Sequence, residues 1–429
     1  MAEIVSPRSL RPVPDELGLY FRAGYNDHRD LAAAIAAGKR KFLGIVFEAH
    51  RVERHRELID SAEKAKLECI LDPCTQPAAT PGGHSSSLAN LAWGSDKPHR
   101  RNDFQGQALK EKANQIASFA IEHGFSQVMA PTHYLSRGSD PWHQIDIEAT
   151  QRLRHALDVA QRRDIGIIYP LTMSYAVLRH EDERLQLLEG LDGLPINSLW
   201  VRIDPFGSDS TGTAVRNFVE ASSDFHRVGV PVIGDQIGGL VGLSLLATSA
   251  VGGLSHGVTL KERFDAANWK RAKSGKGFMP SHRVYFPLLD LYFDVGRSRR
   301  IFDGSDRLKG HFGCSDPSCC PRGVIDMLEN PGNHFLTQRM RQIDGLASIP
   351  ESLRARQFLE QFMRPTADAV VRFASSRSLN EDEKLRMERH RKRLDLLRIA
   401  LEDLIGSMAP RTISVQPVAR TIRENRLSR

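Results

Sequence analysis

A short apolar run rich in β-branched residues, followed by a stretch of helical periodicity, occurs eight times between residues 19 and 260. This alternation is typical of parallel strands joined by crossover helices. Gly124, Gly166 and Gly229 each stand just before a strand, where a helix C-terminus favours glycine. The expected strands cover residues 19–25, 42–48, 67–72, 126–131, 165–172, 197–204, 230–235 and 252–258.

The number of units favours a closed barrel over an open sheet. A doubly wound sheet usually has fewer units and a glycine-rich first turn, and no Gly-x-Gly-x-x-Gly follows the first strand here. Eight parallel strands close into a barrel, which uses ~250 residues as one domain. We therefore predict an α/β fold, a (βα)8 TIM-type barrel with a Cys/His insert after the last strand and C-terminal helices.

The same patterns divide the chain into five parts. A Pro-rich irregular segment precedes the barrel, and a long insert with Pro, Gly, His and Ser follows the third strand, where a lid or binding loop is expected. The parts are an irregular segment (1–18), the barrel (19–260), a basic insert with a cysteine cluster (261–333), C-terminal helices (334–408) and a basic flexible tail (409–429).

Composition limits the compartment and the partners. The formal net charge is +7 and the pI about 9.2, a balance that favours phosphate-bearing partners. Five cysteines, an odd count with three in one cluster, argue against a secreted disulfide framework. No signal peptide and no run of ~20 apolar residues is present, so we predict a cytoplasmic protein without a membrane span.

Ionisable residues stand at the ends of the expected strands, where a barrel gathers its catalytic groups. Asp72 and Asp204 are favoured because each opens an Asp-Pro step directly after an apolar run. The alternative for any one of them is a carboxylate that caps the next helix. Other strand-end candidates are Glu48, His133, Arg202, Asp235, Gln236 and His256.

A cysteine and histidine cluster follows the barrel. Cys314, Cys319, Cys320 and His334 supply the four ligands of a tetrahedral zinc ion, so a structural zinc is expected. The alternatives are buried free thiols or a redox-active vicinal pair. Basic residues from Lys261 to Lys276 and at 297–300 offer contacts to a phosphate backbone, with Trp269, Phe278 and Tyr285 able to stack on bases. A solvated charged insert is the other interpretation.

This layout resembles the tRNA-guanine transglycosylase superfamily, which includes DNA-modifying relatives. Gly238-Gly239-Leu-Val-Gly is similar to the family's Gly-Gly turn, and Asp72 with Gln76 is similar to its Asp-Ser-Gly-Gly-Phe-Gln segment. Gly257-Val258 with Phe264-Asp265 resembles the family's late strand that bears the catalytic aspartate. The two glycines of the Asp72 segment are missing, the Gly-Gly turn follows the seventh strand, and the cysteine spacing differs from the family's.

The resemblance implies base exchange on tRNA or DNA by double displacement, with a flipped-out target base. Asp72 would act as acid and base, and Asp204, Asp235 or Asp265 as the nucleophile. The substrate-binding residues implied at the mouth are Glu48, Gln76, His133, Arg202, Gln236, Gly238, Gly239 and His256.

Two other functions fit the sequence. A barrel lyase, aldolase or hydrolase acting on a small molecule would use the same acidic residues, although no lysine stands clearly at a strand end for Schiff-base chemistry. A non-enzymatic barrel protein could join a nucleic-acid-associated complex through its basic helices. A homodimer is compatible with each of these functions.

Overall fold

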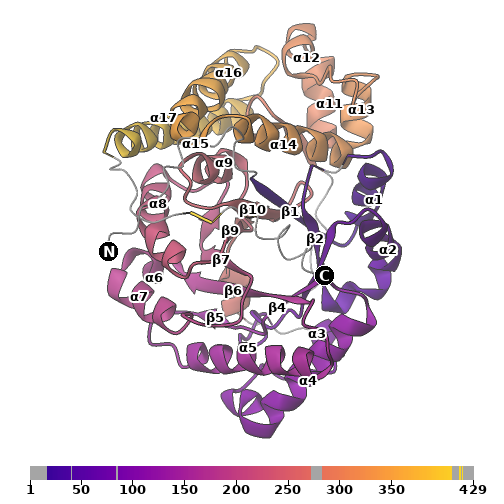
Figure 1. Cartoon of the computed structure of the whole chain (residues 1–429). Coiled ribbons are helices and arrows are strands. Elements are labelled where there is room, and N and C mark those ends of the chain that lie inside the picture. The colour runs from indigo at the N-terminus through magenta and orange to yellow at the C-terminus, as the bar shows by residue number, and fades with distance from the viewer. Residues whose placement is uncertain are drawn as a thin grey trace.

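The computed structural model describes residues 17–39, 41–83, 86–271 and 283–407, together with residues 415, 416 and 418. Eight parallel strands pair in a closed ring, and the β1–β10 and β4–β6 pairings complete the circle (Figure 1). The predicted (βα)8 barrel is therefore confirmed. The strands of the ring are β1 (Gly18–Arg22), β2 (Gly44–Glu48), β3 (Glu68–Asp72), β4 (Gln127–Met129), β6 (Gly166–Ser174), β7 (Ser198–Asp204), β9 (Val232–Asp235) and β10 (Gly253–Gly257).

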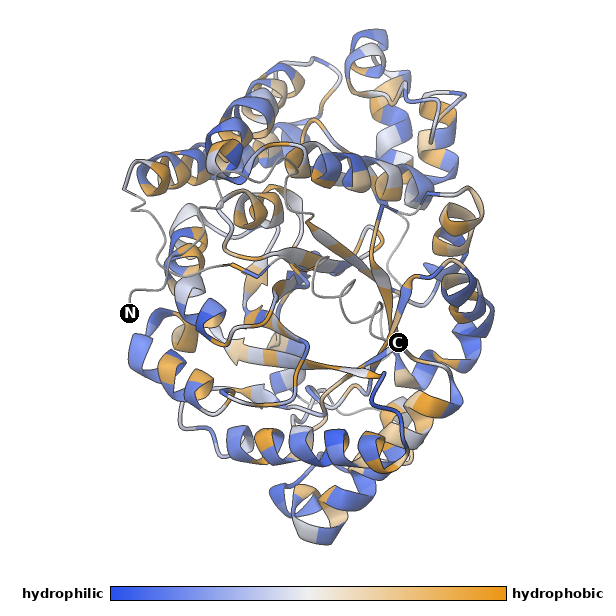
Figure 2. Ribbon diagram, viewed as in Figure 1, coloured by the Kyte–Doolittle hydropathy of each residue, from blue (hydrophilic) through white to orange (hydrophobic). Residues whose placement is uncertain are grey.

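Helices between successive strands form the outer layer. Their apolar sides face the barrel and their polar sides face outward (Figure 2), the pattern of surface helices. Thr211 and Ser174 accept hydrogen bonds from backbone amides at two helix N-termini. The helices are α1 (His28–Ala36), α2 (Arg56–Lys64), α3 (Ser86–Ala89), α4 (Gly106–Glu122), α5 (Trp142–Val159), α6 (Tyr175–Arg179), α7 (Glu181–Glu189), α8 (Gly212–Arg227) and α9 (Gly239–Ala247).

Apolar side chains fill the lower part of the barrel interior. Tyr20 and Trp200 pack there with ring centroids 5.0 Å apart, and Ile70 and Ile233 belong to the same buried cluster. Side chains alternate between the two faces of a strand, so residues two positions further along face the same interior. The residues that follow at this spacing are Arg22, Asp72, Arg202 and Asp235.

The described residues near the C-terminus return to the barrel. Val418 is 1% exposed and belongs to the cluster inside the barrel, and its side chain approaches Gly18 and Gly252 at the amino ends of two strands. For Val418 this corrects the flexible tail predicted over 409–429; the other tail residues, apart from 415 and 416, lie outside the described residues.

Beyond the barrel the chain forms a hairpin and a layer of helices that covers one side of it (Figure 1). Gly212 allows the backbone of α17 to approach α8, because a Cβ there would lie 2.5 Å from the Leu396 carbonyl oxygen. None of the helices in the described part of the chain has the length and apolar character needed to cross a bilayer. The elements are β11 (Arg263–Phe264), which pairs with β8 (Phe206–Gly207), then α10 (Ala267–Lys270), β12 (Arg283–Phe286), β13 (Leu291–Asp294), α11 (Val295–Asp303), α12 (Asp306–Phe312), α13 (Val324–Glu329), α14 (Pro331–Ala347), α15 (Glu351–Phe358), α16 (Arg364–Ala374) and α17 (Glu381–Ser407).

Candidate active site at the barrel mouth

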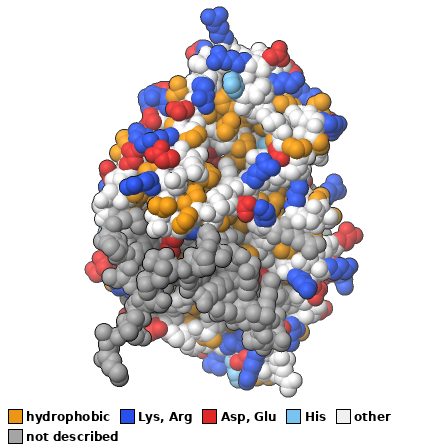
Figure 3. Space-filling model, turned by 45° about the horizontal axis from the view of Figure 1, so that its top comes forward, with side chains coloured by type: hydrophobic (Ala, Val, Ile, Leu, Met, Phe, Trp, Pro, Cys, Tyr) orange, Lys and Arg blue, Asp and Glu red, His pale blue; other side chains and the backbone are white. Residues whose placement is uncertain are grey.

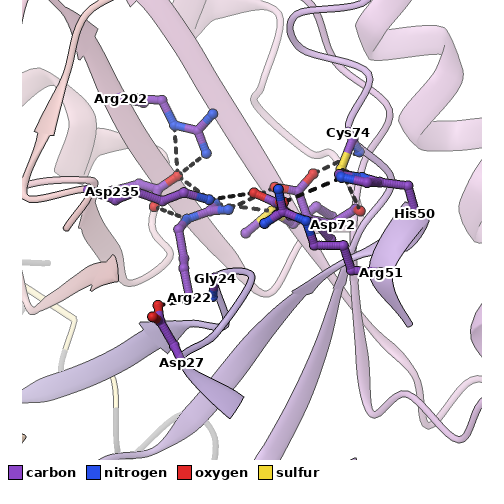
Figure 4. Close-up of polar contacts among 12 residues, drawn as sticks. Arg22, Gly24, Asp27, His50, Arg51, Asp72, Cys74, Arg202 and Asp235 are labelled. Carbon is purple, nitrogen blue, oxygen red and sulfur yellow. Dashed lines mark hydrogen bonds and ion pairs between the residues drawn. The ribbon is translucent and has the colours of Figure 1, made fainter. Parts of the chain in front are cut away.

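Two arginines and two aspartates form an ion-pair network across the upper end of the barrel interior (Figure 4). The Arg22 guanidinium donates to both carboxylate oxygens of Asp235 and, through Nη1, to Asp72 Oδ2, each at 2.8 Å. Arg202 Nε donates to Asp235 Oδ2 at 2.9 Å. The structure thus brings together three of the predicted site residues, from three strands, around a fourth group, Arg22, that the sequence analysis missed.

The position of Asp235 makes it the centre of this network. Its carboxylate is fully buried and serves two arginines. Burial by itself would raise the pKa of Asp235, but Arg202 and Arg22 outweigh that effect and hold the pKa well below its usual range. A permanently ionised carboxylate with both oxygens engaged orients its neighbours, so we assign Asp235 a positioning role.

The loop after β3 fixes Asp72. Its Oδ1 accepts the backbone N–H of Cys74 at 2.8 Å, and Cys74 has a φ of 60°, a left-handed conformation that is strained for a residue with a side chain. Thr75 Oγ1 donates to the Thr132 carbonyl at 2.9 Å, and Trp93 Nε1 donates to the Pro73 carbonyl at 3.0 Å. The long insert after β3 is therefore bound to the barrel and holds Asp72 in one orientation.

Asp204, at the end of β7, has a different environment. Its Oδ2 accepts hydrogen bonds from Tyr134 Oη at 2.8 Å and Lys270 Nζ at 2.6 Å, and Oδ1 accepts the Ala266 N–H at 2.7 Å. The carboxylate is buried, whereas the Lys270 side chain is 53% exposed. Burial, followed by the bond to Asp204, raises the pKa of Tyr134. Asp204 thus sits between the buried network and the solvent.

Glu48, at the end of β2, binds two cations of the rim. It pairs with Lys261 and with Arg51 Nη1, the latter at 2.8 Å. Burial would raise the pKa of Glu48, but Lys261 and Arg51 lower it well below its usual range. His50 Nδ1 lies 3.7 Å from Cys74 Sγ, so the ends of β2 and β3 are in contact (Figure 4).

Buried polar groups near the network that lack a hydrogen-bond partner among the described residues include Ser255 Oγ, in register with Asp235, and two groups at the mouth. The two groups at the mouth are Gln76 Nε2 and Thr172 Oγ1. Thr172 pairs in register with Arg202, so its side chain faces the barrel interior. The Gln76 carbonyl accepts the N–H of Tyr134 at 3.2 Å, which places Gln76 close to the Asp204 side of the mouth. Unpaired buried polar groups are costly, so these two are available for hydrogen bonds to a substrate.

The two histidines predicted at the barrel mouth, His133 and His256, lie outside the barrel wall. His133 Nδ1 is 2.7 Å from Asp146 Oδ1 and its ring stacks on Trp142 of α5 at 3.8 Å. Burial lowers the pKa of His133 to about 3. His256 packs edge-on against Phe21 and against Phe335 of α14. The strand ends carry these rings toward the helices, so they do not join the network inside the barrel.

Side chains of the protein itself occupy the space beside the Gly238-Gly239 turn. A Cβ on Gly238 would lie 2.3 Å from Glu262 Oε1, and Leu240 N donates to Asp290 Oδ2 at 2.7 Å at the start of α9. Glu262 in turn pairs with Arg339 of α14 at 2.6 Å. Gly238 and Gly239 therefore contribute to docking the C-terminal helices onto the mouth.

The remaining predicted residues lie near the rim. Gln236, directly after β9, is half-buried and has a φ of 57°. The Asp265 side chain is 46% exposed and pairs with Arg263 at 3.3 Å, separate from the buried network. Tyr285 is completely buried, which corrects its prediction as a base-stacking residue. Lys273, Lys276 and Phe278 lie outside the described residues.

On the face shown in Figure 3, lysine and arginine side chains are interspersed with aspartate and glutamate side chains. Cations do gather at the rim of the barrel, where Arg51, Lys261 and Lys270 each pair with a carboxylate of the mouth.

The cysteine cluster forms a compact group with metal-binding geometry. The ligand atoms of Cys314, Cys319, Cys320 and His334 all lie within 4.8 Å of one another. Cys314 Sγ and Cys319 Sγ are 3.6 Å apart, near the ~3.8 Å edge of a tetrahedron with 2.3 Å bonds. His334 Nε2 is 3.0 Å from the Tyr285 carbonyl, which leaves Nδ1 as the unprotonated nitrogen, 3.4 Å from Cys320 Sγ. The group thus fits a tetrahedral metal ion.

No family model matches the chain, and no curated protein matches it either. Among solved structures, a GH18 chitinase from Pseudoalteromonas aurantia aligns at 11% identity over 56% of this chain and 92% of that chain, with a TM-score of 0.37. A putative deoxyribose-phosphate aldolase from Coccidioides immitis aligns at 10% identity over 58% and 87%, with a TM-score of 0.37. The 3-dehydroquinate dehydratase from Enterococcus faecalis aligns at 10% identity over 58% and 91%, with a TM-score of 0.35. The function must therefore be argued from this chain's own residues.

Proposed function

We propose that the chain is a nucleic-acid base-exchange enzyme of the transglycosylase type, acting at the barrel mouth. The proposal rests on one combination of features. Asp72 and Asp204 stand at the mouth of a closed barrel in different environments, and a Cys3His group lies further along the chain, after the barrel and a hairpin. The resemblance stated from the sequence implies this combination. The cations of the rim suit the phosphates of the substrate.

Asp204 serves as the nucleophile in this mechanism. Lys270, Tyr134 and the Ala266 amide bind its carboxylate and fix its orientation, and Lys270 is exposed enough to move aside for a substrate. A carboxylate oxygen of Asp204 bonds to C1′ of the target nucleotide while the C1′–N bond breaks and its electron pair leaves with the base. The incoming base then attacks C1′ through its nitrogen and releases Asp204.

Asp72 serves as the acid and base. It gives a proton to the departing base and takes one from the incoming base, so the two half-reactions balance without another reactant. Arg22 and the Cys74 amide fix its two oxygens, and Asp235 and Arg202 fix Arg22 in turn. Gln76 Nε2 and Thr172 Oγ1 supply unused hydrogen-bonding groups for the base.

We propose zinc for the Cys3His group, because three thiolates and one imidazole in tetrahedral array are the ligand set zinc prefers. Cys320→Ser should reduce bound zinc from about one per chain to nearly none, as measured by elemental analysis. It should also destabilise the α13 and α14 region, because metal binding and local folding are coupled. A Cys69→Ser control, outside the group, should retain the metal; metal-free wild-type protein of unchanged stability would contradict the zinc assignment.

The proposed function is tested by base exchange. Purified protein is incubated with tRNA or with duplex DNA and radiolabelled guanine, and label in the polymer is counted. We expect label in one of the two polymers and none with Asp72→Asn. Exchange on neither polymer, combined with turnover of a small phosphorylated or carbonyl compound, would instead favour the small-molecule barrel enzyme.

A further inference from the structure

A cavity of about 370 Å³ lies beside the ion-pair network, and the mechanism above does not use it. The loops that follow β1 and β10 form its walls, and the N-terminal residues of α14 close one end. Gly24 and Arg51 border both the cavity and the network region (Figure 4). The residues that carry its chemistry are Tyr25, Asp27, Arg51, Lys261 and Arg283.

Tyr25 gives the cavity a fixed aromatic surface. Its side chain is 51% exposed, yet the Arg54 guanidinium lies 3.8 Å from the ring centroid, within cation–π range. Arg54 Nε also donates to the Tyr25 carbonyl at 2.9 Å. An exposed ring braced in this way can stack on a planar ligand at little cost in side-chain entropy.

Three cations line the same cavity. Arg51 and Lys261 are both anchored by Glu48, which sets their position at the wall. Arg283, at the start of β12, is exposed. A phosphate can accept several hydrogen bonds from such groups.

Asp27 and Asp30 are the two carboxyl groups of the cavity. Asp27 Oδ2 accepts the Gly24 N–H at 3.1 Å, and burial raises the pKa of Asp27. The opposite wall is strained, because Thr259 and Lys261 have φ values of 60° and 55°. Non-glycine residues in this conformation persist where a binding loop must keep a particular shape.

We propose that this cavity binds a nucleotide adjacent to the target nucleotide in the same strand. Its base stacks on Tyr25 and its phosphate meets Arg283, Lys261 and Arg51. The inference rests on the proposed function and names a second contact of that substrate. In this arrangement the cavity residues hold the nucleic-acid strand, whereas Asp72 and Asp204 act on the target nucleotide.

The test compares wild type with Tyr25→Ala and Arg283→Ala, using short single-stranded oligonucleotides that contain one guanine. Fluorescence anisotropy gives the affinity, and the exchange assay gives KM and kcat. Tyr25→Ala should weaken binding about tenfold or more, raising KM with little change in kcat. Arg283→Ala should reduce the slope of log affinity against log salt by about one. Arg163→Ala, 85% exposed beyond α5, is the matched control and should leave the affinity and slope unchanged.

A second measurement locates the nucleotide. Oligonucleotides with an abasic residue on either side of the guanine should lose affinity for wild type at one of the two positions. At that position Tyr25→Ala should add little further loss, because both changes remove the same stacking contact. Wild-type binding and exchange with no effect of Tyr25→Ala or Arg283→Ala would overturn the inference alone. Absence of wild-type binding and exchange would overturn the proposed function as well.

Discussion

Asp204→Asn should reduce the rate of base exchange by about 10³-fold or more while the protein stays folded. The amide keeps the shape of the side chain. Its oxygen can still accept from the Ala266 N–H and its NH2 group can donate to Tyr134 Oη, but it cannot form the bond to C1′. Lys270 loses its partner at little cost because its side chain is half-exposed. Single-turnover kinetics and the thermal midpoint measure the two parts of this prediction.

The control is Asp192→Asn, at an exposed position in the loop before β7, at the opposite end of the barrel. It should leave both the rate and the thermal midpoint unchanged. If Asp204→Asn retained full exchange activity, the nucleophile would have to be another group. If it unfolded, the contacts of Asp204 with Tyr134 and Ala266 would be structural.

Asp235→Asn should lower the free energy of unfolding by about 3 kcal/mol, the order expected when one partner of a buried ion pair is removed. The substitution leaves Arg202 without its carboxylate and Arg22 with only Asp72. Urea titration of the variant and wild type measures the difference. Arg163→Ala, which removes an exposed ion pair 3.9 Å long, should change stability by less than about 0.5 kcal/mol.

The same ion-pair network should make the free energy of unfolding decrease in strong acid. Because the folded pKa of Asp235 lies below its usual value, its contribution is present above the unfolded pKa and is lost as pH falls through the folded value. The stability difference between wild type and Asp235→Asn should therefore be constant near neutral pH and shrink in strong acid. A difference that stayed constant in strong acid would show that Asp235 is not held ionised by Arg22 and Arg202.

The barrel was predictable because its signal is local and repeated. Each strand is an apolar run long enough to be recognised, and all eight expected runs became strands of the ring. Arg22 was missed because the first strand was expected to run to residue 25, which puts this arginine inside the strand, whereas site residues were sought at strand ends. Its partners stand 50 and 213 residues away, so only the closure of the barrel brings them together.

The direction of side chains was harder to predict. Asp235 and His256 both stand at strand ends, yet one faces the interior and the other faces α14. The alternation of side chains along β10 decides which of its residues face inward. The inward positions of β10 are occupied by small residues such as Ser255, so the sequence carries no apolar signal for them.

The four residues of the Cys3His group could be predicted from the sequence because they lie within 21 positions of one another.

A covalent intermediate would test the catalytic centre most directly. Wild-type protein is incubated with the nucleic acid on which it exchanges, without an incoming base, then digested and examined by mass spectrometry. The account predicts a nucleotide adduct on the peptide that contains Asp204, and its absence in Asp204→Asn. An adduct on a residue outside the barrel mouth, or exchange that proceeds with no adduct on Asp204, would contradict it.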